Sequence, residues 1–272
     1  MFEAFGIVRQ QSWDRALDWL ELAARQGSRS AREQLLLLAD NDRDPSVSDE
    51  ASDDFWRHLH ARISVDDRIV AGEKIPLSES PRIRIIKQFA TEAECRWIMR
   101  NAEPRLGRAT VFDKRTGGQI ADPSRDNSFL VVGISEMNVL TEVIRHRISV
   151  ATGLPVPLFE PSQILRYSVG QRFTAHCDFL DPDNPAYRDE LAHFGQRIGT
   201  FLIYLNHDYE GGETSFPEIG LNYRAVAGDA LFLANVTRDG RADPMTLHAG
   251  LPPTAGEKWV FSQWIRDQFP KE

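Results

Sequence analysis

Three side chains that can ligate a metal ion occur at two places in the sequence. His176 and Asp178 are separated by one residue, so on a strand both side chains project from the same face. His248 lies further along the chain, directly before Ala249 and Gly250. Two imidazoles and one carboxylate form the facial triad of non-haem Fe(II) oxygenases, which leaves coordination positions open. The sequence therefore predicts a catalytic metal site at His176, Asp178 and His248.

The short motif at 176–178 gives weak support when it is taken by itself. With 7 histidines and 40 acidic residues in 272 positions, roughly one His-x-acid triplet arises by chance. A lone histidine is more often a hydrogen-bonded or surface side chain than a ligand. The other histidines lack a carboxylate at ligand spacing and are expected at the surface or in helix caps; they are His58, His60, His146, His193 and His207.

An inward-facing lysine points to a second component of the site. Lys258 follows His248 by 10 residues, in a stretch with the alternation of a strand. The residues that share its face are Val260, Ser262 and Trp264. A buried ammonium is costly unless it is paired, so the distal carboxylate of a dicarboxylate is a physically cheap partner. Thr200 and Tyr204 share one face of another strand and can add hydroxyl hydrogen bonds.

These segments together resemble the catalytic domain of the prolyl 4-hydroxylase family of Fe(II)/2-oxoglutarate-dependent dioxygenases. The motifs are EPSQILRYSVGQRFTAHCD, IGTFLIYLNHDYEGGETSFP, AVAGDALFLANV, LHAG and EKW, and the match runs from about 81 to 270, with PRIRIIKQFATEAEC at its start. The resemblance implies that the triad binds iron and that Lys258 grips 2-oxoglutarate with help from Thr200 and Tyr204. Tyr167 lines the same pocket in this interpretation.

The resemblance also suggests where the substrate lies. The family's substrate-side positions correspond to Arg125 and Glu160, with Trp264 near the site. Where many members read Arg-Thr-Ser, this chain reads Arg125, Asp126, Asn127, so the substrate groove is less well defined than the iron site. The segment EGGETSFPE at 210–218 is interpreted first as a structural hairpin, with Thr214 able to face the cavity.

The implied activity is hydroxylation of an unactivated C–H bond, with a prolyl residue of a peptide or protein as the leading substrate. Its cofactors are Fe(II), 2-oxoglutarate and O2, with ascorbate as a candidate reductant. A hydroxylase of a free amino acid or another small metabolite would use the same iron and cosubstrate residues. The triad is also compatible with a non-catalytic metal-binding scaffold, or with a cupin-like barrel that holds Mn, Co or Zn without 2-oxoglutarate.

The expected fold is mainly β with flanking helices. A double-stranded β-helix, or jelly roll, forms the catalytic domain at 81–272, because several short strand-like stretches follow 154 without alternating helices. A small helical region at 1–80 precedes it, with two amphipathic helices within 13–39 that resemble one tetratricopeptide-like hairpin, and a linker at 40–54.

Other helices are expected within this scheme. A capping box at Thr91 and Glu94 opens one helix, and a second covers 135–152 and is expected to lie against a sheet. The irregular segment 179–199 resembles a lid over the substrate more than a disordered loop.

Bulk properties narrow the partners. The net charge of −8 provides no basic surface for nucleic acid, and no apolar run is long enough for a membrane span. The N-terminus lacks the pattern of a secretory signal, so a cytoplasmic location is expected. Cys95 and Cys177 form no CxxC pair and are expected to be reduced. Partners are therefore a peptide, protein or small-molecule substrate, with a protein partner conceivable through the N-terminal helices.

Overall fold

The contacts within the chain divide it into a helical unit and a β-rich unit. The computed structural model describes Ala4 and residues 10–40, 52–108, 110–113, 118–121, 124–133 and 136–269. The helical unit comprises Met1–Ala71 and Ile134–Gly153, and the β-rich unit comprises Gly72–Gly133 and Leu154–Glu272. The sequence placed this division at residue 80 and assigned all later residues to the catalytic domain. Residues 41–51 of the expected linker lie outside the described residues.

In the part of the helical unit that the structure describes, the two helices expected within 13–39 are present, and further helices follow at 53–60, 65–68 and 139–152. Its helices are α2 (Trp13–Arg25), α3 (Arg29–Leu38), α4 (Asp53–His60), α5 (Val65–Arg68) and α7 (Val139–Thr152). Ser12, Ser28 and Ser52 begin α2, α3 and α4, since each hydroxyl accepts a backbone N–H of the first turn. Within this unit α7 contacts α3 and α5. The predicted role of these helices in binding a protein partner stays a prediction.

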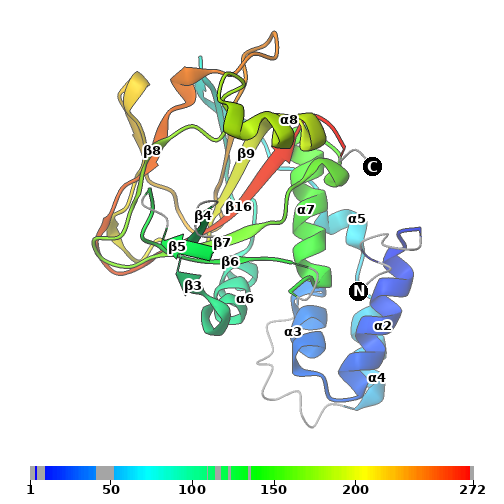
Figure 1. The fold of residues 1–272 in the computed structure, drawn as a ribbon. Coiled ribbons are helices and arrows are strands. Elements are labelled where there is room, and N and C mark those ends of the chain that lie inside the picture. Colours follow the sequence, from blue (N-terminus) through cyan, green and yellow to red (C-terminus); the bar gives the residue numbers. More distant parts are fainter. Residues whose placement is uncertain are drawn as a thin grey trace. The chain divides into compact units, whose positions relative to one another are not determined.

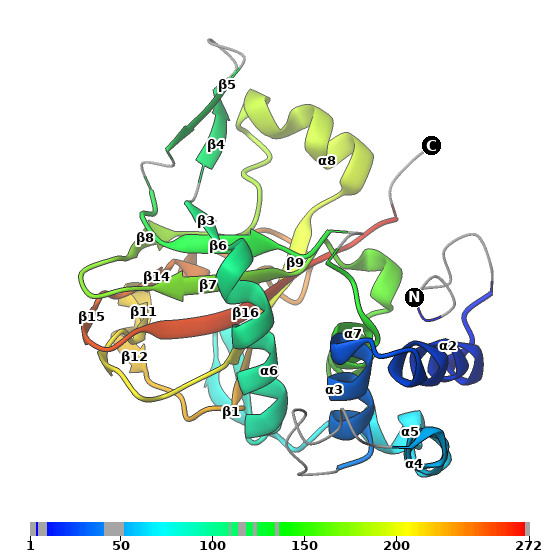
Figure 2. The same cartoon turned by 90° about the horizontal axis from the view of Figure 1, so that it is seen from below.

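A large antiparallel sheet forms the base of the β-rich unit (Figures 1 and 2). Its strands, in spatial order, are β1 (Lys74–Glu79), β2 (Arg82–Ile86), β13 (Ala230–Ala234), β9 (Arg197–Tyr204), β16 (Lys258–Arg266), β7 (Gln163–Tyr167), β6 (Ser128–Val131) and β3 (Gly107–Arg108). Every neighbouring pair is antiparallel. The central strands β9, β16 and β7 carry the residues of chemical interest.

A smaller antiparallel sheet faces the central strands. Its order is β12 (Leu221–Tyr223), β11 (Thr214–Phe216), β14 (His248–Gly250) and β8 (Phe173–His176). Two short pairs complete the strands: β10 (Glu210–Gly211) with β15 (Pro253–Ala255), and β4 (Thr110–Asp113) with β5 (Gly118–Ala121). Tyr204, Leu231 and Val260 of the large sheet pack in one core with Phe216 of the small sheet. This arrangement confirms the predicted jelly roll.

Two helices accompany the sheets in this unit. α6 (Glu92–Ala102) begins with the predicted capping box between Thr91 and Glu94 and lies along one face of the large sheet (Figures 1 and 2). The segment 179–199 is ordered, with a 3-10 turn at Pro185–Tyr187 that leads into α8 (Arg188–Phe194). Its closure over a substrate stays a prediction. Among the described residues, no helix combines the length and apolar character needed to cross a bilayer.

Candidate metal and cosubstrate site

The three predicted metal ligands converge in the small sheet. His176 ends β8 and His248 begins β14, and the two are direct partners in the antiparallel pairing. The Nε2 atoms of His176 and His248 lie 3.6 Å and 3.5 Å from the two carboxylate oxygens of Asp178. One ligand atom from each residue lies within 4.8 Å of the others, and no other such group occurs in the described part of the chain. The predicted triad is therefore assembled.

Hydrogen bonds around the triad fix the orientation of each ligand. The Nδ1 atoms of His176 and His248 lie 2.8 Å and 3.0 Å from the backbone carbonyl oxygens of Thr174 and Thr246. With Nδ1 engaged, each Nε2 is directed toward Asp178, as in many metal sites. The donor set and its supports fit a divalent iron ion.

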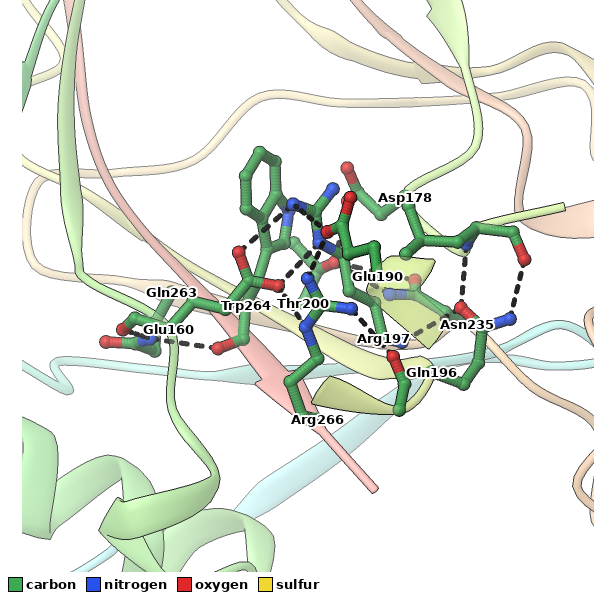
Figure 3. A network of polar contacts seen from close by, with 12 residues as sticks. Glu160, Asp178, Glu190, Gln196, Arg197, Thr200, Asn235, Gln263, Trp264 and Arg266 are labelled. Carbon is green, nitrogen blue, oxygen red and sulfur yellow. Dashed lines mark hydrogen bonds and ion pairs between the residues drawn. The ribbon is translucent and has the colours of Figure 1, made fainter. Parts of the chain in front are cut away.

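The carboxylate of Asp178 is held from the large sheet. The Thr200 hydroxyl donates to Asp178 Oδ2 at 2.6 Å and accepts from the Asn235 amide at 3.0 Å (Figure 3). Because both partners of the hydroxyl are buried, the carboxylate has little freedom to rotate. Thr200 is thus positioned as a support for a metal ligand.

The ionisation of the triad favours metal binding at neutral pH. Burial opposes the charge on Asp178, but His248, His176 and the Thr200 hydroxyl outweigh that effect and hold its pKa below the usual range. Burial lowers the pKa of His248, with partial compensation by Asp178. An ionised carboxylate and a neutral imidazole are the forms that bind metals.

A cavity between the two sheets joins the triad to Lys258. Its walls come from strands of both sheets and contain the alternating face of β16 that the sequence predicted. The lining residues include Arg125, Gln163, Tyr167, Phe173, His176, Asp178, Thr200, Leu202, Thr214, His248, Lys258, Val260, Ser262 and Trp264. The apolar side chains and the charged ends together suit a small anion bound next to a metal.

Lys258 is a buried cation that lacks a counterion in this cavity. Lys258 is 2% exposed, and no carboxylate of the described residues lies in ion-pair contact with its ammonium. The Thr214 hydroxyl, 3.5 Å from Nζ, accepts a hydrogen bond from it, and the Tyr204 hydroxyl lies 2.8 Å from the Thr214 hydroxyl. Burial lowers the pKa of Lys258 to about 8, and Glu213 opposes the shift. A buried ammonium in this setting favours an anionic ligand.

Two tyrosine rings lie close to the ammonium of Lys258. Nζ lies 5.6 Å from the ring centroids of both Tyr167 and Tyr204. Burial raises the pKa of both phenols, so each keeps its proton as a hydrogen-bond donor. Tyr167 lines the cavity, and Tyr204 lies behind Thr214; the contact of both with 2-oxoglutarate stays a prediction.

The two hydroxyls predicted on β9 contact different parts of the site. Thr200 and Tyr204 are four residues apart on the strand, which separates them by about 13 Å. The structure brings Thr200 to Asp178 and brings Tyr204 to Lys258. Thr214 of β11 is the hydroxyl that contacts the lysine, although the sequence interpreted its segment first as a structural hairpin.

Of the three residues predicted on the substrate side, two line the cavity and one does not. Arg125 and Trp264 line the cavity. The guanidinium of Arg125 lies 4.8 Å from the ring of Phe129 and 5.3 Å from that of Phe173, which stacks on His176. Glu160 is absent from the cavity lining, because its carboxylate is engaged by Arg197 and Arg266.

Comparison with known proteins finds a matching family model and relatives that agree with it. Residues 162–266 match the family model described as the 2OG-Fe(II) oxygenase superfamily. Prolyl 4-hydroxylase 1 of Arabidopsis thaliana is 32% identical over 207 residues, which is 71% of each chain. Prolyl 4-hydroxylase subunit alpha-1 of Rattus norvegicus is 35% identical over 190 residues, 70% of this chain and 35% of that subunit.

A solved structure agrees with the fold. The viral collagen prolyl hydroxylase of Paramecium bursaria Chlorella virus-1, described as a complex with 2OG, aligns with a TM-score of 0.51 at 26% identity. The alignment covers 67% of this chain and 94% of that one.

Proposed function

Because the chain belongs to the prolyl 4-hydroxylase family of Fe(II)- and 2-oxoglutarate-dependent dioxygenases, we propose that its substrate is a prolyl residue in a peptide or protein. The names of the relatives support this substrate class. The same iron and cosubstrate residues would serve a free amino acid, so the substrate needs its own test.

We assign the residues of the cavity to two tasks. His176, Asp178 and His248 hold Fe(II), and Thr200 keeps the Asp178 carboxylate in place. Lys258, with Thr214 and Tyr204, holds the distal carboxylate of 2-oxoglutarate. When bound, iron with 2-oxoglutarate and O2 supplies the oxidising chemistry that converts a C–H bond to C–OH.

The protein's own contribution is orientation and exclusion of water. The cosubstrate is gripped at its far carboxylate by Lys258, so its other end is directed toward the triad. Leu202, Val260 and Phe173 line the walls between, which limits access of water to the reacting centre. The observation that carries this assignment is the buried ammonium of Lys258, which forms no ion pair with a carboxylate of the described residues and lies in a cavity shared with the triad.

The substrate class can be tested with matched peptides. The iron-loaded protein is incubated with 2-oxoglutarate and a set of proline-containing peptides, each paired with a version in which alanine replaces proline. A mass gain of one oxygen atom in the proline version alone supports the proposal. Free L-proline and other free amino acids form a parallel arm.

The controls separate loss of chemistry from choice of the wrong substrate. His248→Ala removes a proposed iron ligand, so oxygen incorporation should disappear with it. Oxygen incorporation into a free amino acid, with none into any peptide, would contradict the peptide assignment and leave the oxygenase class intact.

A further inference from the structure

One side chain closes the base of the loop that runs from Asp178 to β9. Gln196 is the last residue before β9, and its Oε1 accepts the Leu180 N–H at 2.7 Å. Its Nε2 donates to the Leu180 carbonyl at 2.6 Å. One carboxamide thus engages both polar backbone groups of a residue 16 positions earlier, as a neighbouring strand would. We call this pair of hydrogen bonds the Gln196 clasp.

Gln196 is itself held against the end of the large sheet. Its backbone N–H donates to the Asp267 carboxylate at 2.9 Å, and its carbonyl accepts the Asp267 N–H at 3.0 Å. Its Oε1 also accepts the N–H of Arg197, the first residue of β9, at 2.9 Å. Asp267 directly follows β16, so these contacts tie Gln196 to two central strands. The clasp therefore holds Leu180 to the sheet.

The clasp supports a metal ligand on the side that β8 does not reach. Asp178 comes two residues after the end of β8 and two residues before Leu180. Leu180 is 5% exposed, so packing fixes its side chain and the clasp fixes its backbone. The Thr200 hydroxyl holds the Asp178 carboxylate and belongs to the same network of polar contacts as Gln196 (Figure 3). The side chain of Asp178 is thus positioned through Thr200 and its main chain through Gln196.

Beyond the clasp, the loop is attached to the end of β16 by polar contacts. No residue of α8 is buried. The Gly195 carbonyl accepts from Arg266 at 2.7 Å, and the Leu191 carbonyl accepts from Gln268 at 3.3 Å. Glu190 lies 2.5 Å from Arg266. Water can replace such partners, so α8 can leave its place without exposing a core residue.

We propose that Gln196 is a positioning residue that keeps Asp178 in place while the loop 181–195 moves. The clasp lies between the ligand and the loop, so motion of the loop stops at Leu180. Residues that orient a metal ligand typically contribute about 10- to 100-fold to metal affinity. The inference rests on the proposed iron site, but it does not depend on the identity of the substrate.

The test measures metal binding with Co(II), whose visible absorption reports its ligands. Gln196→Met keeps the length of the side chain and removes both bonds of the clasp, so the Kd for Co(II) should rise about tenfold or more. Gln196→Glu can still accept N–H groups but cannot donate to the Leu180 carbonyl, so it should lose affinity as well. It replaces Gln196→Met if that protein does not fold.

Gln34→Met is the matched control for the loss of a carboxamide. Gln34 also accepts a backbone N–H, from Leu140 at 3.3 Å, and donates to a backbone carbonyl, that of Ser30 at 3.2 Å. It belongs to the helical unit. Both variants should lower the Tm of the metal-free protein, because each loses hydrogen bonds to the backbone. Only Gln196→Met should weaken Co(II) binding.

Hydrogen exchange of the metal-free protein tests the clasp itself. The Leu180 amide should exchange at least about tenfold faster in Gln196→Met than in the parent, since it loses its acceptor. Gln268→Ala removes a contact of α8 and should speed the exchange of the α8 amides. Because the clasp stays intact in Gln268→Ala, its Kd for Co(II) should remain within about twofold of the parent value.

The outcomes separate this inference from the proposed function. A parent protein that binds no Co(II) contradicts the proposed iron site, and the inference fails with it. When the parent binds Co(II), an unchanged Kd in Gln196→Met and Gln196→Glu overturns the positioning role alone. A loss of affinity in Gln34→Met or Gln268→Ala as large as in Gln196→Met overturns it as well.

Discussion

Replacing Lys258 with methionine should stabilise the metal-free protein while it destroys cosubstrate binding. The two side chains have similar length, and methionine fills an apolar site without a charge. Burial lowers the pKa of Lys258 from 10.5 to about 8, so keeping the ammonium charged at neutral pH costs about 3 kcal/mol. The substitution removes that cost. It also removes the one cation that we assign to the distal carboxylate of 2-oxoglutarate.

The sizes of the two effects follow from the same burial. For a chain of this size, about 3 kcal/mol corresponds to a rise in Tm of roughly 5–10 °C. Loss of one partner of a buried charge pair costs at least about 2 kcal/mol, so the Kd for 2-oxoglutarate should increase about 30-fold or more. The triad is untouched, so the Kd for the metal should stay within about twofold.

Calorimetry of the metal-free protein measures the first effect, and anaerobic titration of the metal-loaded protein with 2-oxoglutarate measures the second. Lys74→Met, at an exposed position of β1, is the control for loss of one positive charge. A lower Tm for Lys258→Met would mean that the ammonium has a counterion that the structure does not place. Equal losses of metal and 2-oxoglutarate affinity would show that Lys258 does not act on the cosubstrate specifically.

Two further predictions follow from the same cavity. The folded-state pKa of Lys258 is below its unfolded value, so the stability gain of Lys258→Met should be full below pH 8 and fade as the pH rises to 10.5. The parent's affinity for 2-oxoglutarate should fall about tenfold per pH unit above 8, because the ammonium then loses its proton. Calorimetry and titration across this pH range check the two predictions, and a flat profile would refute them. Thr200→Val should weaken Co(II) binding about 10-fold or more and leave 2-oxoglutarate binding unchanged. Thr214→Val should weaken 2-oxoglutarate binding about fivefold and leave metal binding unchanged. Spectrophotometric titrations of both variants with each ligand measure these affinities, and the same losses in both variants would contradict the assignment.

The metal site could be predicted because its strongest signal is local. His176 and Asp178 are one residue apart, and strand periodicity alone places them on one face. The inward direction of Lys258 followed from the alternation of β16 in the same way. The jelly roll followed from a succession of short strands without helices between them. Each of these inferences needed only a few neighbouring residues.

The division of labour between the hydroxyls could not be predicted in this way. Alternation places Thr200 and Tyr204 on one face of β9 but does not say which end of the strand lies next to Lys258. That depends on the register with β16, which pairs Tyr204 with Val260 and Thr200 with Trp264. Thr214 comes from another sheet, and its approach to Lys258 depends on the packing of two sheets.

The role of Glu160 depends on contacts that are even more remote in sequence. Its partners Arg197 and Arg266 belong to β9 and β16, and nothing in the residues around 160 indicates them. The residues next to a glutamate in the sequence do not indicate whether its carboxylate faces a cavity or belongs to an ion cluster. Family position suggested the first environment, and the structure shows the second.

The register between β9 and β16 determines where Thr200 and Tyr204 lie relative to Lys258 and Trp264. A slip of one residue would turn Thr200 and Tyr204 to the opposite face of the sheet, and a slip of two would displace both by about 7 Å from their present partners. A bulge at Ile198 lies beyond Thr200, at the end of the paired region. It can therefore redirect Arg197 toward Trp264 without disturbing the pairs that place Thr200 at Asp178 and Tyr204 at Lys258. The part of the wall that contains Trp264 is thus shaped independently of the pairs that place Thr200 and Tyr204.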